Sequence, residues 1–181
     1  MFDPSHTSNH TTGRPLASAP GESCPLRIAV VIVAYNSRDD LALALPALRQ
    51  GLQSHRYVLW IIDNASRDGS VDYVREEQRL DPHIQLVLNN RNRGYTAAIN
   101  QGLDQAGDAE YVLLLNPDVL IPPTTIPTLL QEMEKDAAIG VIAPQMRRRN
   151  GAVLSSCRRF PRSRDVFGEW LPHRLLHRLW P

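Results

Sequence analysis

The sequence has little cysteine. Of its 181 residues only Cys24 and Cys157 are cysteines, and neither lies in the CxxC or Cys/His spacing that would indicate a zinc site. The composition therefore excludes a disulfide scaffold and predicts two free thiols. The first 25 residues also lack the apolar run of a signal peptide, so we expect a reducing, cytoplasmic location.

Long apolar runs and nucleotide-binding glycine motifs are also missing. The longest apolar runs, 28–35 and 111–115, have the length of strands, far below the roughly 20 residues of a transmembrane helix. The first run is followed by residues without glycine, which disfavours a dinucleotide fold and its hydride chemistry. The single lysine, Lys135, follows no glycine at the GxxxxGK spacing, which excludes nucleotide hydrolysis by a P-loop.

The charges are divided unevenly along the chain. Residues 1–145 contain 17 acidic and 11 basic side chains, whereas residues 146–181 contain 2 acidic and 9 basic ones. A basic tail indicates a polyanionic partner, but it lacks the interleaved aromatics of a nucleic-acid arm, so we expect no nucleic acid. An apolar strip in the tail would suit peripheral contact with the inner face of the cell membrane, or it is a helix without its covering half. The strip consists of Trp170, Leu171, Leu175, Leu176, Leu179 and Trp180.

Strand patterns and helix patterns alternate through most of the chain. Residues 1–25 have almost no aliphatic side chains and predict a disordered leader. The expected strands are 28–35, 58–62, 84–88 and 112–115. The expected helices are 38–52, with Ser37 and Asp40 as a capping pair, 70–80, 95–106 and a fourth that has Pro122 and Pro123 in its first turn. Such short alternating units require a mostly parallel sheet with helices on both faces, so residues 26–145 are expected to form an α/β domain.

Polar residues gather directly after each expected strand. The clusters are Tyr35-Asn36, Asp63-Asn64-Ala65-Ser66, Asn92-Arg93-Gly94 and Asn116-Pro117-Asp118. Any one of them taken alone is better explained by turns and helix caps than by function. All four fall at the carboxyl ends of strands, where open α/β sheets bind their ligands, so together they predict one binding site.

Four segments follow one another along the chain: Val-Val-Ile-Val-Ala-Tyr-Asn-Ser, Ile-Ile-Asp-Asn-Ala-Ser-Arg-Asp-Gly-Ser, Asn-Arg-Gly-Tyr-Thr-Ala-Ala-Ile-Asn-Gln-Gly and Leu-Leu-Leu-Asn-Pro-Asp-Val. Taken in this order, they closely resemble family 2 glycosyltransferases, which have the Rossmann-like GT-A fold. The resemblance covers about residues 27–160 and implies the amino-terminal, donor-binding half of such an enzyme. It implies inverting transfer of a sugar from a nucleoside diphosphate to an acceptor hydroxyl, in the synthesis of a cell-surface polysaccharide. The Asn-Pro-Asp segment resembles that of bacterial rhamnosyltransferases, which suggests a dTDP- or UDP-linked donor and a lipid-linked or polysaccharide acceptor.

The resemblance also assigns roles to individual residues. Tyr35 would stack on the nucleobase, and Asp63 would accept a hydrogen bond from a base N–H. Asp118 would hold a Mg²⁺ or Mn²⁺ ion that bridges the diphosphate. The other nucleotide-binding positions implied are Asn36, Asn64, Gly94 and Asn116, although Asn64 is better suited to shape its turn.

A general base, expected as an Asp or Glu in a later segment, is not found. The only acids after Asp136 are Asp165 and Glu169, and neither lies in a matching acidic pair. No catalytic residue is therefore identified, and the base is expected beyond Pro181. On this interpretation 146–181 is the incomplete, basic start of the acceptor half of a truncated enzyme. The alternative is an inactive remnant or a module that only binds the nucleotide sugar.

Overall fold

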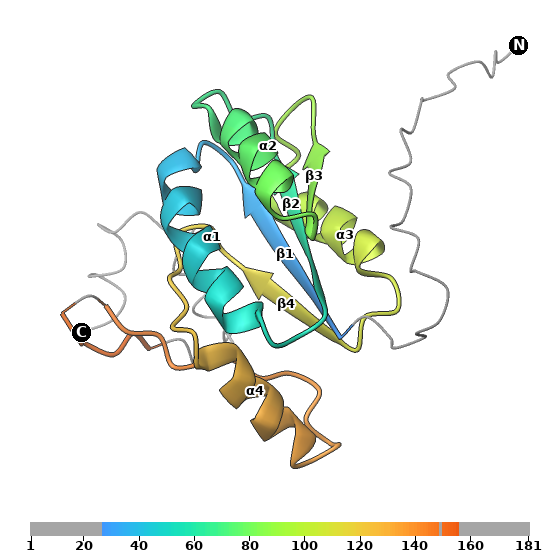
Figure 1. The fold of residues 1–181 in the computed structure, drawn as a ribbon. Helices are drawn as coiled ribbons and strands as arrows, with labels where there is room; N and C mark the ends of the chain where they lie inside the picture. Colours follow the sequence, from blue (N-terminus) through green and yellow to red (C-terminus); the bar gives the residue numbers. More distant parts are fainter. Residues whose placement is uncertain (1–26, 149, 156–181) are drawn as a thin grey trace, which may run out of the picture. The chain divides into compact units, whose positions relative to one another are not determined.

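The computed structural model describes residues 27–148 and 150–155, and the first part of this range forms a parallel β-sheet (Figure 1). The four strands lie in the order β3-β2-β1-β4. They are β1 Ile28–Ala34, β2 Tyr57–Asp63, β3 Ile84–Leu88 and β4 Tyr111–Leu115. Ala34 pairs with Asp63, and Asp63 with Leu88, so three strands end at the same level and their following loops meet at one edge.

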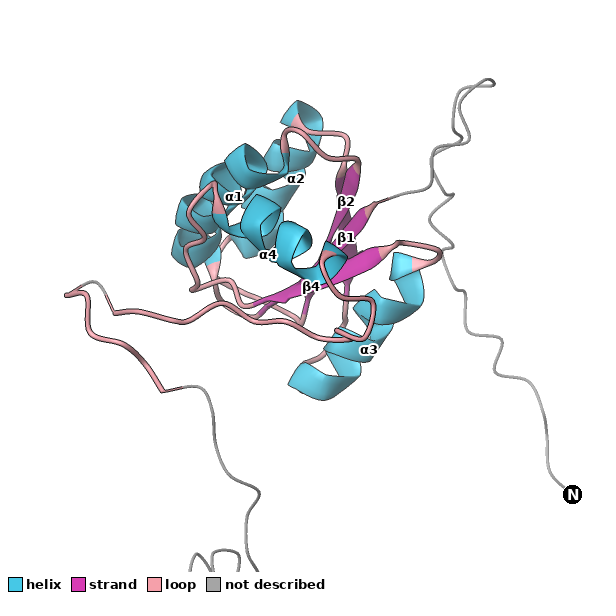
Figure 2. Cartoon of the chain, turned by 90° about the horizontal axis from the view of Figure 1, so that it is seen from below, coloured by secondary structure: helices cyan, strands magenta, loops and turns pink. Residues whose placement is uncertain are grey.

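Helices cover both faces of this sheet. They are α1 Arg38–Leu52, α2 Ser70–Leu80 and α3 Tyr95–Ala106, and a fourth helix, α4, spans Thr125–Glu134. α1 and α2 lie on one face and α3 on the other (Figure 2). Every residue of β1 is buried, because this strand lies inside the sheet between two helical layers. The predicted α/β class, with a parallel sheet and helices on both faces, is confirmed.

The fourth helix begins later than predicted. Pro122 and Pro123 precede α4, and the Thr125 N–H donates to the Pro122 carbonyl at 2.9 Å to close a turn before the helix. Pro127 lies in the first turn of α4 instead, where a missing N–H costs no intrahelical hydrogen bond.

The predicted capping pair of α1 does not form. Ser37 is the N-cap residue, but its side chain makes no cap hydrogen bond. Its Oγ donates to the Tyr35 carbonyl at 3.2 Å, because the loop after β1 turns back on itself. Asp40 is exposed and is free for another role.

By their contacts the described residues fall into two compact units, 27–126 and 127–155 without residue 149. In the second unit an isolated antiparallel bridge pairs Arg147 with Val153. The domain boundary expected after residue 145 stays a prediction. The expected leader 1–25 and the apolar strip of the tail lie outside the described residues. None of the helices in the described range is long and apolar enough to cross a membrane.

A cluster around Asp81 joins α1 and α2 to the amino end of the sheet. The Asp81 carboxylate accepts hydrogen bonds from the Tyr57 hydroxyl at 2.9 Å and the His83 N–H at 3.0 Å, and it lies 3.3 Å from Arg49 Nε. Arg49 also pairs with Glu77 of α2. Burial raises the pKa of Asp81, but the hydrogen bonds from His83 and Tyr57 outweigh it and hold the pKa below 3.8. Burial and the bond to Asp81 raise the pKa of Tyr57 to about 12, so its hydroxyl remains a donor.

We expect Asp81→Asn to lower the free energy of unfolding by about 2 kcal/mol at pH 7, since a charged acceptor of several hydrogen bonds is lost. A depressed pKa in the folded state gives stability that is present above the unfolded pKa and is lost as pH falls through the folded pKa. The gap between wild type and variant should therefore narrow below about pH 4, measured by urea denaturation. Asp72→Asn, an exposed change on α2, the helix that Asp81 follows, should alter stability by less than about 0.5 kcal/mol. A gap that stays constant down to pH 2.5 would contradict the prediction.

Candidate functional site

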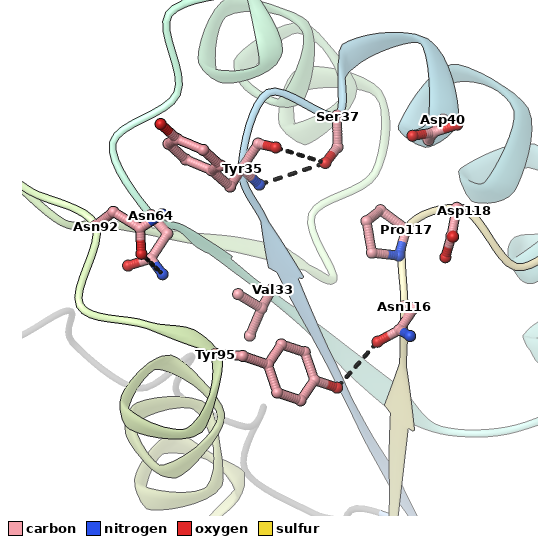
Figure 3. Close-up of a pocket in the computed structure, with 10 residues that line it drawn as sticks. All are labelled: Val33, Tyr35, Ser37, Asp40, Asn64, Asn92, Tyr95, Asn116, Pro117 and Asp118. Atoms are coloured by element: carbon pink, nitrogen blue, oxygen red, sulfur yellow. Dashed lines mark hydrogen bonds between the residues drawn. The ribbon is translucent and has the colours of Figure 1, made fainter. Parts of the chain in front are cut away.

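A cavity of about 520 Å³ opens at the carboxyl edge of the sheet (Figure 3). Segments that follow all four strands contribute to its wall, as the four polar clusters predict. The lining residues are Val33, Tyr35, Ser37, Asp40, Asn64, Asn92, Tyr95, Asn116, Pro117 and Asp118. The volume lies within the range of small-molecule sites, roughly 300–1,000 Å³.

Hydrogen bonds connect the loops after β1 and β2 beside this cavity. Side chains of the loop after β2 accept hydrogen bonds from backbone N–H groups at the start of α1. Ser66 Oγ accepts from the Asn36 N–H, and Asp68 Oδ2 from the Arg38 N–H, both at 2.9 Å. The N–H of Arg38, one of the orphan donors at the start of α1, is thus satisfied by another loop rather than by α1 itself.

Asp68 is the main acceptor of the hydrogen bonds around these two loops. It also accepts from the Ser70 hydroxyl at 2.5 Å and from the Ser70 N–H at 3.0 Å. Burial raises the pKa of Asp68, but the bonds from Ser70 and Arg38 outweigh it and lower the pKa below its usual value. Asp68 therefore stays ionised at neutral pH and fixes the loop that carries the cavity wall.

Asn64 holds the loop after β3 in place. It is only 2% exposed. Its Oδ1 accepts from the Arg93 N–H at 3.1 Å and from Asn89 Nδ2 at 3.2 Å, and its Nδ2 donates to Asn92 Oδ1 at 3.0 Å and to the Gly94 carbonyl at 3.3 Å. A carboxamide has two donor hydrogens and two acceptor positions, so the described bonds use its whole capacity. Asn64 therefore shapes the wall of the cavity from within the protein.

Three of the residues expected to bind the nucleotide also line this cavity, and protein partners do not use all of their hydrogen-bonding capacity. Tyr35 is 51% exposed, and no partner of its hydroxyl is described. Asn116 and Asp118 lie on the segment after β4, and Asp118 is exposed. In Figure 3, Asp118 and Asp40 lie to the right of the cavity, and Asn64 and Asn92 to the left.

Two other expected residues do not line the cavity. Asn36 adopts a positive φ of 51°, and its Oδ1 accepts from the Arg67 N–H at 2.8 Å. Gly94 has a φ of 81° and precedes α3, and its N–H donates to Asn92 Oδ1 at 2.8 Å. Both shape loops at the cavity, and their direct contact with a nucleotide stays a prediction.

Asp63, which also does not line the cavity, is the last residue of β2 and is 3% exposed. Its Oδ1 accepts from the Ser66 N–H at 2.9 Å. Its Oδ2 is buried without a hydrogen-bond partner. A buried carboxylate oxygen is costly to leave unpaired, so this atom suits a donor that arrives with a ligand.

The sequence did not point to three of the polar lining residues, Ser37, Asp40 and Tyr95, as site residues. Asp40 belongs to the first turn of α1, and Tyr95 is the first residue of α3. In a parallel sheet the first turn of each following helix also faces the carboxyl edge. That position, in the first turn of the helix after a polar cluster, is the signal by which Asp40 and Tyr95 could have been found.

The charged side chains of the cavity wall, Asp40 and Asp118, are both carboxylates. No hydrogen bond or ion pair of either is described, and hard oxygen donors suit Mg²⁺ or Mn²⁺. Within residues 27–148 and 150–155, no three His, Cys, Asp or Glu side chains group as a metal site. The donor set therefore fits an ion that takes its other ligands from phosphate oxygens and water.

Comparison with known proteins places this site in context. A family model described as glycosyl transferase family 2 matches residues 29–174. Over 111 residues the chain is 33% identical to an undecaprenyl-phosphate 4-deoxy-4-formamido-L-arabinose transferase of Pseudomonas syringae, a match that covers 60% of this chain and 33% of the relative. Over 144 residues it is 30% identical to an N-acetylglucosaminyl-diphospho-decaprenol L-rhamnosyltransferase of Mycobacterium tuberculosis, covering 74% of this chain and 46% of the relative. The chain thus spans a third to a half of the length of these relatives.

A solved structure with a similar fold is a mannosyltransferase from Pyrobaculum calidifontis in complex with GDP-Man and Mn²⁺. Its TM-score is 0.58 at 23% identity, over 75% of this chain and 39% of that one. The likeness confirms the predicted GT-A fold.

Proposed function

Since the chain belongs to glycosyl transferase family 2, we propose that its cavity binds the nucleoside diphosphate of a sugar donor. The observation that carries the proposal is the convergence of Tyr35, Asn116 and Asp118, from segments after two different strands, on one cavity at the carboxyl edge. A cavity of about 520 Å³ has room for a nucleotide. The relatives and the GT-A fold support the same class of ligand.

The nucleobase is proposed to lie between Tyr35 and Asp63. An exposed aromatic face can stack on a base for roughly 1–3 kcal/mol. The unpartnered Oδ2 of Asp63 would accept an N–H of the base, which removes the cost of a buried unpaired oxygen. A pyrimidine, in a dTDP- or UDP-linked donor, is our proposal for the base.

The diphosphate is proposed to lie towards Asp118. Asp118 would hold a divalent ion, with Asp40 as the second carboxylate of the same wall. Such an ion, when bound, neutralises the charge that develops on the departing diphosphate. Asn116 would contribute hydrogen bonds to the ribose or phosphate oxygens without adding a third negative charge.

The reaction proposed for the whole enzyme is transfer of the sugar to an acceptor hydroxyl with inversion, in the synthesis of a cell-envelope polymer. The relatives act on polyprenyl-linked compounds by their names, which supports a lipid-linked acceptor for this chain. Contact of the basic tail with the membrane belongs to this proposal, and most of that tail lies outside the described residues. The general base also stays to be assigned.

Calorimetric titration of the purified chain with TDP, UDP and GDP, each with Mg²⁺, with Mn²⁺ and with EDTA, tests the donor site. We expect TDP or UDP to bind, more tightly with either metal and more tightly than GDP. Binding of no nucleotide under any condition would refute the donor site. Transfer of labelled sugar from the best donor to polyprenyl-linked acceptors then tests the reaction separately.

A further inference from the structure

Tyr95 contacts the Asn116-Pro117-Asp118 segment, and none of the roles proposed above involves this contact. Its hydroxyl donates to Asn116 Oδ1 at 3.0 Å, so the first residue of α3 reaches across the cavity edge to the segment after β4 (Figure 3). Both side chains line the cavity. Tyr95 is 53% exposed, so this is a contact between two wall residues and not part of the core.

The bond fixes which end of the Asn116 carboxamide is available to a ligand. A phenol that donates to Oδ1 leaves Nδ2 on the side away from Tyr95 (Figure 3). No protein partner of Nδ2 is described, and a carboxamide nitrogen can only donate. The wall therefore offers an N–H donor at a position where a carboxylate would offer an acceptor and a negative charge.

Tyr95 is itself held in position by the loop before it. Gly94 takes a φ of 81°, and its carbonyl and N–H are bound by the side chains of Asn64 and Asn92. The first turn of α3 is thus anchored to the end of β2 through the buried Asn64. This anchoring gives the Tyr95 hydroxyl a defined place opposite Asn116.

We propose that Tyr95 is a positioning residue, whose hydroxyl holds the Asn116 carboxamide with Nδ2 ready to donate to an oxygen of the bound nucleoside diphosphate. The inference rests on the proposed donor site and deepens it. It assigns a residue of α3 a part in the specificity of that site. It also explains why Asn116 would bind an acceptor oxygen of the ligand. Tyr95 acts through Asn116 and does not need to touch the nucleotide.

The test is a double-mutant cycle on nucleotide binding, with Tyr95→Phe, Asn116→Ala and the double variant, titrated with TDP and UDP at saturating Mg²⁺. Tyr95→Phe keeps the ring and should weaken binding about fivefold, which equals about 1 kcal/mol. Asn116→Ala should weaken it about tenfold, and the double variant no further, because the hydroxyl acts only through Asn116. Tyr73→Phe, which removes a hydroxyl from α2 outside the cavity wall, is the matched control and should bind like wild type.

The titrations distinguish failure of the donor site from failure of the positioning role. Wild-type protein that binds no nucleotide overturns the donor site and this inference together. Wild-type binding with an unchanged Tyr95→Phe, or with losses that add in the double variant, overturns only the positioning role. Thermal unfolding distinguishes a damaged fold, since Tyr95→Phe should unfold within about 1 °C of wild type because its hydroxyl is at the surface.

Discussion

Replacing Gly102 with alanine is expected to destabilise the sheet domain by about 2 kcal/mol, against the trend of helix propensity. Gly102 lies in α3, where glycine is normally about 1 kcal/mol worse than alanine. On an exposed helix surface the change would therefore stabilise. The opposite sign is expected here because α3 packs directly on β1 and β2 at this residue.

The reason is the space around the missing Cβ. A Cβ built on Gly102 would lie 2.3 Å from Val31 Cγ1 and 3.4 Å from Ile62 Cγ1. Val31 is fully buried and, being β-branched, cannot rotate away at low cost. The helix would have to move off the sheet, and overpacking of this kind costs about 3 kcal/mol at its upper end. Subtracting the gain of about 1 kcal/mol in helix propensity leaves the expected loss of about 2 kcal/mol in stability.

Urea denaturation of Gly102→Ala, Val31→Ala and the double variant measures this effect. Val31→Ala alone should cost about 2–3 kcal/mol as a buried truncation. In the double variant the shortened side chain makes room for the new methyl group, so the combined loss should be smaller than the sum by at least about 1 kcal/mol. Gly140→Ala, where a Cβ meets nothing within 4 Å, is the control. Gly102→Ala with wild-type stability would show that α3 does not press on β1 as described.

The order of strands and helices was predictable from the sequence because its causes are local. The run 28–34 is apolar at every position because both faces of β1 are covered. The helices α1 to α3 each bury only one face, so their buried residues recur at helical spacing. The start of α4 was not predictable, since Pro122 and Pro123 fit the turn before a helix as well as the first turn within it.

The position of the site was predictable, but the direction of its side chains was not. Polar clusters after parallel strands meet at one edge in any fold of this class. An amide such as Asn36 or Asn64 can serve a ligand or its own loop with equal chemistry. In the structure Asn36 accepts from the Arg67 N–H, and Asn64 bonds with the loop after β3, including the Arg93 N–H. Local sequence does not specify such partners on neighbouring loops.

Replacing Asp118 with asparagine is expected to abolish the effect of Mg²⁺ and Mn²⁺ on nucleotide binding. Asn keeps the size of the side chain and one oxygen but removes the charge that would hold the ion. Wild-type protein should bind TDP or UDP about tenfold more tightly with metal than with EDTA, and Asp118→Asn should bind equally in both. Calorimetry gives the affinities, and titration of Mn²⁺ followed by electron paramagnetic resonance reports the metal directly.

The sign of the change without metal separates a metal site from simple damage. With EDTA the Asp118 carboxylate repels the diphosphate, and two charges about 4 Å apart in water interact by roughly 1 kcal/mol. Asp118→Asn should therefore bind the nucleotide about fivefold more tightly than wild type in EDTA, yet less tightly in Mn²⁺. Asp104→Asn, an exposed change on α3 outside the cavity wall, should leave both affinities unaltered. A damaged cavity would lose affinity for the nucleotide under both conditions, and an unchanged response to Mn²⁺ would assign the metal to other ligands. Only a variant that binds more tightly than wild type in EDTA and less tightly in Mn²⁺ agrees with Asp118 as the residue that holds the ion.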